Sequence, residues 1–522
     1  MVLRTTRNRK VRATKTKYAL VRIVMDPTQA PIPRASTGID GIDHILGGGL
    51  PEGHLYLVDG APGSGKTTLG LQFLLEGIEL GERGIYVTLS ETEAELRTIA
   101  GAHGWSMDEV SICDLQTAEE SLEAETHYTL FHPSEVELSE TTEKVLRTVE
   151  HVQPSRIVFD SLSEMRLLAR DSLRYRRQIL ALKHYFSRRG ATVLVMDTHA
   201  TANDFQIASI AHGVLALEQH MPAYGGQRRR LRFSKVRGVS FREGWHDYRI
   251  RRGGLEVYPR LAAGEHRRSF EREQISSGVS EVDALVGGGL ERGSSALLLG
   301  ASGTGKSTLA MQYCRAAAER GERSIAFLFD ELRDSWLMRG RSLGVPVDDY
   351  VERGLIKIHQ VNAAELSPGE LAHRIRSAVE TEDVQLVLID SVDGYRSAMP
   401  EERFLSLHLH EVLSYLGQHG VVTFLTAVQH GLVGDKLTAP TDLSYIADTV
   451  FLLRYFEAFG ELRQAVSALK KRLGFRERQI RELQIRAPEG IVVGEALSEF
   501  GGVLSGSPTF HGSRPHLIKN SP

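Results

Sequence analysis

Two stretches of the chain repeat each other, and this repeat constrains the fold more than any other feature. Residues 36–73 (STGIDGIDHILGGGLPEGHLYLVDGAPGSGKTTLGLQF) align without gaps with residues 276–313 (SSGVSEVDALVGGGLERGSSALLLGASGTGKSTLAMQY), so that Ser36 corresponds to Ser276 at a shift of 240 residues. Self-similarity over such a length indicates two homologous domains in tandem. A chain of 522 residues also exceeds what one hydrophobic core usually organises.

Each repeat predicts an α/β domain, because short apolar strands alternate with glycine loops and amphipathic helices. Such alternation is typical of a mostly parallel, twisted sheet flanked by helices, with ligands at the carboxyl ends of its strands. The first repeat predicts strands at 54–59, 84–89, 156–159 and 192–196 and a helix at 66–80. The second predicts strands at 296–299, 324–329, 386–389 and 421–425 and a helix at 306–319.

Composition divides the rest of the chain. We expect a disordered basic arm at 1–27, a first domain at 28–255, a charged linker at 256–274, a second domain at 275–500 and a tail at 501–522. The arm carries eight lysines and arginines before its first acidic residue, Asp26. Such a segment could contact nucleic acid or direct the chain to an organelle, and an unstructured tail fits equally well.

Both repeats contain a phosphate-binding loop. Residues 60–67 (GAPGSGKT) and 300–307 (GASGTGKS) fit the pattern G-x-x-x-x-G-K-[ST]. Glycines let successive backbone N–H groups surround the phosphates of ATP, and the following helix directs its positive end at them. The predicted ATP-binding residues are Gly60, Gly63, Ser64, Gly65, Lys66, Thr67 and Thr68, with Gly300, Gly303, Thr304, Gly305, Lys306, Ser307 and Thr308.

Magnesium accompanies ATP in such sites, and each repeat offers two ligands for it. Thr67 and Ser307 end the loops, and Asp160 and Asp390 follow apolar strands as the acids of a Walker B motif. The alternative is that each aspartate only caps the helix that follows.

Hydrolysis needs a group that orients or deprotonates water, and a carboxylate at the end of the strand beside the loop is well placed for this. Glu91 and Glu331 stand there, 240 residues apart, and Asp330 precedes the second of them. Alternatively, Glu91 and Glu331 are first-turn acids that interact with a helix dipole.

Cations must neutralise the charge that develops on the transferred phosphoryl group, often from a neighbouring subunit. Lys235 and Arg237 in the first half, and Lys470 and Arg472 in the second, stand in similar basic, strand-like segments. We predict that they act in trans. A solvated basic edge strand would give the same pattern.

Composition excludes several classes of protein. The formal net charge of −3 gives no field that favours nucleic acid, and no apolar run approaches the roughly 18 residues of a membrane helix. The two cysteines, Cys113 and Cys314, are too few for a disulfide framework and favour a reduced, cytoplasmic protein.

The tandem loops, the paired Gly-Gly-Gly-Leu lead-ins at 47–50 and 287–290, the Lys-x-Arg segments and the carboxyl-terminal LSGSPT at 504–509 resemble the KaiC family of circadian clock ATPases. The resemblance spans nearly the whole chain after Pro27. It implies RecA-like P-loop domains in two stacked hexameric rings with ATP and Mg²⁺ between subunits. It further implies that the first ring hydrolyses ATP slowly and that the second phosphorylates its own subunits.

The resemblance assigns roles by position. Glu91 matches the catalytic glutamate of the first ring, with Ser90 in place of the acid before it, and Asp330 takes the general-base position of the second ring. The two phosphoacceptors fall on Ser444 and Tyr445, and the phenol of Tyr445 is longer than the threonine hydroxyl it replaces.

Partners follow from the same resemblance. A KaiB-like protein on the first ring is implied more readily than a KaiA-like protein, which in the family grips the tail, because the tail beyond Thr509 is short here.

Two other functions fit part of the pattern. A RecA-type motor on DNA would share both domains, but no DNA-binding motif or aromatic basic groove accompanies them. A signalling scaffold, in which ATP only holds subunits together, would share every motif above.

Overall fold

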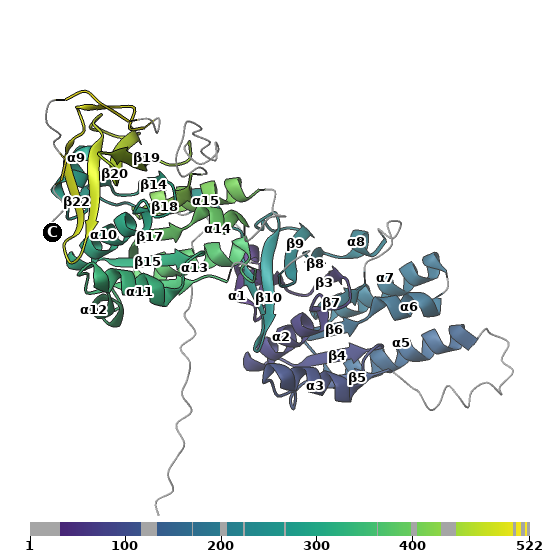
Figure 1. Cartoon of the computed structure of the whole chain (residues 1–522). Helices are drawn as coiled ribbons and strands as arrows, with labels where there is room; N and C mark the ends of the chain where they lie inside the picture. Colours follow the sequence, from purple (N-terminus) through teal and green to yellow (C-terminus); the bar gives the residue numbers. More distant parts are fainter. Residues whose placement is uncertain are drawn as a thin grey trace, which may run out of the picture.

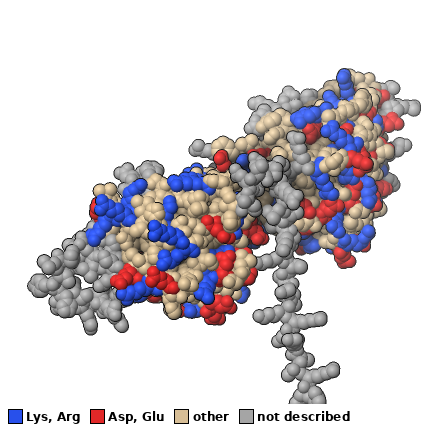
Figure 2. All heavy atoms as spheres, turned by 180° about the vertical axis from the view of Figure 1, so that it is seen from behind, with Lys and Arg blue, Asp and Glu red and all other residues tan. Residues whose placement is uncertain are grey.

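The computed structural model describes residues 32–115, 133–169, 171–198, 206–222, 225–265, 268–362, 364–397, 404–429, 445–504, 508–512 and 517–518. Within this part of the chain no helix is long and apolar enough to cross a membrane. The predicted basic arm lies outside the described residues. On the face shown in Figure 2, basic and acidic side chains are interspersed over both domains.

The first domain is built on a nine-stranded sheet in the order β11-β10-β9-β8-β3-β7-β6-β4-β5 (Figure 1). The strands from β8 to β5 in this order are parallel, and β9, β10 and β11 extend the sheet in antiparallel fashion. The strands are β3 (Leu55–Gly60), β4 (Gly84–Thr88), β5 (Ser111–Asp114), β6 (Arg156–Asp160), β7 (Thr192–Asp197), β8 (Gly213–His220), β9 (Arg228–Val236), β10 (His246–Arg251) and β11 (Gly254–Tyr258).

Helices cover both faces of this sheet because its central strands are apolar on both sides. One core lies under α1 (Asp40–Leu46), α2 (Lys66–Glu79) and α3 (Glu93–His103), and the other under α5 (Pro133–Val152), α6 (Leu162–Ala169) and α7 (Ser172–Arg188). A short helix, α8 (Gln206–Ile210), precedes β8, and a small ladder joins β1 (Arg34–Ala35) to β2 (Leu50–Pro51).

The second domain repeats this design with the order β16-β15-β17-β18-β14-β19-β20-β21-β22. Its strands are β14 (Ser295–Gly300), β15 (Arg323–Leu328), β16 (Ile356–Gln360), β17 (Val384–Asp390), β18 (Val422–Val428), β19 (Thr449–Ala458), β20 (Glu461–Lys471), β21 (Arg481–Arg486) and β22 (Gly490–Ala496). Two short ladders pair β12 (Gln274–Ile275) with β13 (Leu290–Glu291) and β23 (Phe500–Gly501) with β24 (Thr509–Phe510).

The helices of the second domain also form two layers. One core lies under α9 (Ser280–Leu285), α10 (Lys306–Glu319), α11 (Arg333–Ser342) and α12 (Val347–Glu352). The other lies under α13 (Pro368–Glu382), α14 (Val392–Ser397) and α15 (Leu405–Gln418).

The predicted fold class is confirmed, and every predicted strand is present with ends displaced by only a few residues. The alternative of a basic edge strand is not excluded by the pairing: β9 and β20 have neighbours on both sides only at residues 230–231 and 464–466, whereas Lys235 and Lys470 lie beyond these stretches and pair on one side, with β8 and β19. The first sheet also runs past residue 255, since β11 ends at Tyr258.

The two domains meet where β10 lies beside α13. The carboxylate of Glu370 in α13, whose side chain is 2% exposed, pairs with Arg249 (2.9 Å) and Arg251 (2.8 Å) of β10. Beside this pair, Asp247 Oδ2 accepts the backbone N–H of Gly369 at 2.7 Å. A buried carboxylate needs such partners, so the junction is held by a charged network.

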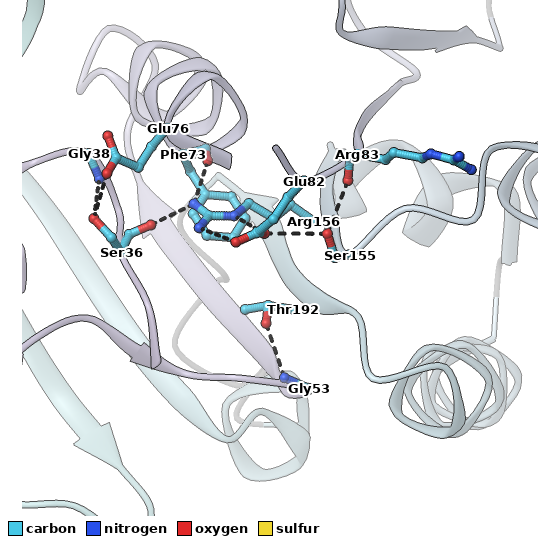
Figure 3. A network of polar contacts seen from close by, with 10 residues as sticks. All are labelled: Ser36, Gly38, Gly53, Phe73, Glu76, Glu82, Arg83, Ser155, Arg156 and Thr192. Atoms are coloured by element: carbon cyan, nitrogen blue, oxygen red, sulfur yellow. Dashed lines mark hydrogen bonds and ion pairs between the residues drawn. The ribbon is translucent and has the colours of Figure 1, made fainter. Parts of the chain in front are cut away.

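A buried arginine fixes the P-loop helix against the sheet of the first domain (Figure 3). Arg156, at the start of β6, donates to Glu82 at 2.7 and 3.1 Å, to the carbonyl of Ser36 at 2.6 Å and to that of Phe73 in α2 at 2.9 Å. Its guanidinium also lies over the Phe73 ring. The strand that ends in Asp160 is therefore tied directly to the helix that begins at Lys66.

Replacing this arginine should destabilise the first domain. We expect Arg156→Met to lower the free energy of unfolding by about 3 kcal/mol, because two carbonyls and a carboxylate lose their donor. Urea unfolding measures the change. Arg83→Met is the matched control, since Arg83 is exposed and donates only to the carbonyl of Val152, and it should change stability by less than about 0.5 kcal/mol. Equal effects of the two variants would contradict the assignment.

Candidate functional site

Both phosphate-binding loops connect the central strand to the helix that follows it. The first runs from the end of β3 to the start of α2, and Gly63 (φ 78°) and Gly65 (φ 94°) have the left-handed backbone that favours glycine. A Cβ at Gly65 would also lie 2.7 Å from Ile250 of β10. In the second loop, Gly303 and Gly305 have φ of 80° and 95°. The predicted loop geometry is present in both domains.

The loop lysines point back over their loops. Lys66 Nζ donates to the carbonyls of Gly60 (2.6 Å) and Ala61 (3.2 Å), and Lys306 Nζ to those of Gly300 (2.8 Å) and Ala301 (2.7 Å). Burial lowers the pKa of both lysines, while aspartates nearby act to raise it. A cation held above a helix N-terminus and a ring of backbone N–H groups is suited to bind phosphate.

Three predicted residues of the first site lie together at the end of the loop. Thr67 Oγ1 lies 3.4 Å from both Glu91 Oε1 and Asp160 Oδ2. Burial, and then the neighbouring Asp160, raise the pKa of Glu91, and burial raises that of Asp160. Glu91 Oε2 is buried and has no hydrogen-bond partner among the described residues. Two crowded carboxylates with an unpartnered oxygen suit a divalent cation.

Sequence reasoning missed Tyr86, which completes this cluster. Its buried hydroxyl donates to Asp160 Oδ2 at 2.6 Å from the neighbouring strand β4. The same position in the second repeat is Ala326, at the shift of 240, so a comparison of the two repeats could have singled out Tyr86.

The second site holds its aspartate from the other side. Thr426 of β18 donates to Asp390 Oδ1, whereas Asp390 Oδ2 is buried without a hydrogen-bond partner in the described part of the chain. The hydroxyl of Ser391 donates to Asp330 Oδ2. Burial lowers the pKa of Lys306 and Asp390 acts to raise it, so this aspartate lies near the loop.

Glu331 differs from Glu91 in its partner. Arg339 of α11 donates to both of its oxygens, at 3.0 and 2.8 Å, whereas no arginine among the described residues pairs with Glu91. Burial raises the pKa of Glu331, and Arg339 counteracts this rise. Nothing in the sequence pattern singled out Arg339, because a helical arginine eight residues from a glutamate is commonplace.

Two alternatives for these acids are wrong. Glu91 and Glu331 are not first-turn residues, since α3 begins at Glu93 after the cap Thr92 and α11 begins at Arg333 after Leu332. Asp160 and Asp390 do not cap the following helices either. In the second domain the backbone N–H of Gly394 donates instead to the hydroxyl of Ser391.

The basic pairs lie at the opposite end of each sheet from the loop of the same domain. Arg237 is level with Leu55, because its N–H donates to the carbonyl of His212, whose own N–H donates to that of Leu55. Leu55 begins β3 and Gly60 ends it, a separation on the order of 17 Å at about 3.3 Å per residue. Arg472 is level with Ser295 through the same contacts at Asp448. These cations cannot reach phosphate bound by their own loop.

The basic side chains contact the segment that leads into the neighbouring strand, β8 in the first domain and β19 in the second. Lys235 and Arg237 donate to the carbonyls of Ala208 and Ser209, and Lys470 and Arg472 to those of Ala447 and Tyr445. Tyr445 is 59% exposed, and Ser444 lies outside the described residues.

The chain was compared with known proteins. The family model described as "ATPase: KaiC" matches residues 35–262 and 275–498. Similar curated proteins include the circadian clock oscillator protein KaiC of Synechococcus elongatus, 29% identical over 92% of this chain and 92% of the relative. That of Parathermosynechococcus lividus is 27% identical over 92% and 88%. The circadian clock protein KaiC3 of a Synechocystis species is 25% identical over 93% and 97%.

The raised pKa of Glu91 predicts a pH-dependent gain in stability when its charge is removed. A carboxyl group whose pKa is higher in the folded state disfavours folding above that pKa, and this penalty is absent below the unfolded value, about 4.5. In EDTA without nucleotide, Glu91→Gln should therefore raise the melting temperature at pH 7.5, and the gain should shrink toward pH 4.5.

Glu95→Gln is the matched control with the opposite sign. The backbone N–H and hydroxyl of Thr92 lower the pKa of Glu95 in the capping box of α3, so this substitution should lower the melting temperature at pH 7.5. A loss of stability in Glu91→Gln would show that Glu91 is a structural rather than a strained group.

Proposed function

The chain belongs to the KaiC family of ATPases, and on this basis we propose that it is a homohexamer of two stacked rings that binds ATP between subunits. In this proposal the first ring hydrolyses ATP, the second phosphorylates Ser444 of a neighbouring subunit, and the phosphorylation state is read by partner proteins. The protein then acts as a timing or signalling hub.

One observation supports the proposal that ATP binds between subunits. Each domain holds its phosphate loop at one end of the central strand and its basic pair at the other, so a single chain cannot place both on one nucleotide. A second copy can, if its basic end faces the loop of the first. A contact of loop end with basic end is heterologous and generates a closed ring when the rotation closes. This favours a ring over a twofold dimer.

The residues fit a magnesium nucleotide. Carboxylate and hydroxyl oxygens lie beside each loop, and among the described residues Glu91 Oε2 and Asp390 Oδ2 are buried and accept no hydrogen bond. Magnesium favours such oxygen ligands. Thr67 and Asp160 would hold it in the first site, and Ser307 and Asp390 in the second. Magnesium held there would supply positive charge that neutralises the phosphates.

The chain's own groups would perform the remaining steps of hydrolysis. Lys66 binds the terminal phosphates. Glu91, whose raised pKa makes it a better proton acceptor than an exposed glutamate, orients the attacking water and takes its proton. Lys235 and Arg237 of the neighbouring copy stabilise the charge on the transferred phosphoryl group.

In the second ring Asp330 would accept the proton of the Ser444 hydroxyl as its oxygen bonds to the γ-phosphorus and the bond to ADP breaks. Lys470 and Arg472 would stabilise the charge on that phosphoryl group, as the first pair does. Tyr445 is a weaker candidate acceptor, because its phenol is longer than a threonine hydroxyl. A KaiB-like protein is the favoured partner on the first ring, and the short tail does not favour a KaiA-like one.

A mixing experiment tests the intersubunit site. Glu91→Gln subunits keep their basic pair, and Arg237→Ala subunits keep their loop and acid, so neither pure ring should turn over ATP at the first site. In rings mixed from equal amounts, roughly a quarter of the interfaces combine two intact halves and should recover that fraction of the rate. Both variants carry Lys306→Ala to silence the second site. Full activity of pure Arg237→Ala rings, or no recovery on mixing, would refute action in trans.

Autophosphorylation needs a separate test. Intact-mass and phosphopeptide analysis after incubation with Mg-ATP should find phosphate on Ser444, and both Ser444→Ala and Asp330→Asn should abolish it. Ser391→Ala is a graded control, because it removes only the hydroxyl that donates to Asp330. Hydrolysis without any phosphopeptide would leave an ATPase ring that is not a kinase.

A further inference from the structure

Three cations of the first domain converge on three consecutive carbonyls at the end of α8. Lys235 Nζ donates to Ala208 at 2.5 Å, Arg237 Nη2 to Ser209 at 2.8 Å and Lys183 Nζ to Ile210 at 2.7 Å. Sequence reasoning singled out the first two and missed Lys183, which comes from α7. Folding thus adds a third positive charge to the predicted pair.

No carboxylate among the described residues forms an ion pair with any of these cations. Burial lowers the pKa of Lys183, and the adjacent Arg237 lowers it further; the same two effects act on Lys235, with a contribution from Lys183. Burial and the neighbouring His54 lower the pKa of His212 beside them to about 4. Within the described part of the chain these like charges have no counter-ion, which favours an anion supplied from outside it.

The second domain differs at two of the corresponding positions. The helix α7 ends at Arg188 and α15 at Gln418, and this shift of 230 residues places Leu413 at the position of Lys183. The residue before β8 is His212 and that before β19 is Asp448, which pairs with Arg472 at 2.9 Å. The first set therefore has three cations and no acid, and the second has two cations and one acid.

We propose that Lys183 is a third cation for the terminal phosphate of the nucleoside triphosphate that the neighbouring subunit binds at its first site. This inference rests on the intersubunit site proposed above and adds to it a residue that discriminates between nucleotides. A cation that contacts the γ-phosphate stabilises bound ATP but not bound ADP, because ADP lacks this phosphate. The first ring then selects ATP over ADP more strongly than it would with the basic pair alone.

Lys183 could instead have a purely structural role. Cations near the end of a helix also interact favourably with its dipole, and Lys183 would then only hold α8 in place. The two readings predict different nucleotide dependence, since a structural support affects ATP and ADP alike.

The experiment measures nucleotide affinity at the first site alone. In full-length Lys306→Ala protein assembled with nucleotide, Kd is compared for ADP and for a non-hydrolysable ATP analogue. We expect Lys183→Gln, which can still donate to the carbonyl of Ile210, to weaken binding of the ATP analogue about tenfold and to leave ADP unchanged, as loss of a charged hydrogen bond does. Lys183→Arg, which keeps the charge, should restore most of the difference.

Lys144→Gln is the matched control. Lys144 also donates to a backbone carbonyl, that of Asp114 at 2.9 Å, but it comes from α5 and is not among the three converging cations, so both affinities should stay unchanged. If Lys183→Gln weakens the binding of ADP and of the ATP analogue equally, or changes neither affinity, the inference is overturned. Lys183→Leu introduces the residue that the second domain has at this position. Its melting temperature shows whether a change in nucleotide affinity comes from loss of the charge or from misfolding.

Arg237→Ala separates this inference from the function on which it rests. If Arg237→Ala selectively weakens binding of the ATP analogue and Lys183→Gln does not, only the role of Lys183 fails. If neither variant is selective, the intersubunit site itself fails.

Discussion

The polarity of the parallel sheet is the constraint on which the rest of the structure depends. A parallel strand has one carboxyl end, and the loop that binds phosphate must follow it so that backbone N–H groups and a helix N-terminus converge there. In both domains the basic pair lies at the end of an antiparallel strand, level with the amino ends of the parallel strands. The distance between the two ends of the central strand, set by the six residues of β3, separates the two halves of a nucleotide site within one chain.

The same scaffold holds two sites with different charged surroundings. Asp160 is held by Tyr86 from one flanking strand and Asp390 by Thr426 from the other. Arg339 binds both oxygens of Glu331, whereas the described part of the chain offers Glu91 no arginine partner. These differences change the charge around each site while the backbone stays the same.

The first phosphate loop and the second domain contact the same strand. Tyr248 of β10 donates to the carbonyl of Ser64 at 2.6 Å, and Ile250 lies against Gly65. Arg249 and Arg251, which alternate with these residues, pair with Glu370 of α13. Successive side chains of a strand point to opposite faces, so one strand serves both contacts. Replacement of either set of residues would disturb both the loop and the junction.

The sequence by itself determined the repeat, the α/β class, the strands and the phosphate loops, because each depends on local patterns of apolar residues and glycine. It also located Asp160, Glu91 and Thr67, since the ends of neighbouring parallel strands must meet. Only the tertiary structure decided the rest. The places of Tyr86, Arg339 and Lys183 depend on contacts between elements that no spacing in the sequence specifies. Local patterns encode elements and their ends, whereas packing between elements decides which side chains meet.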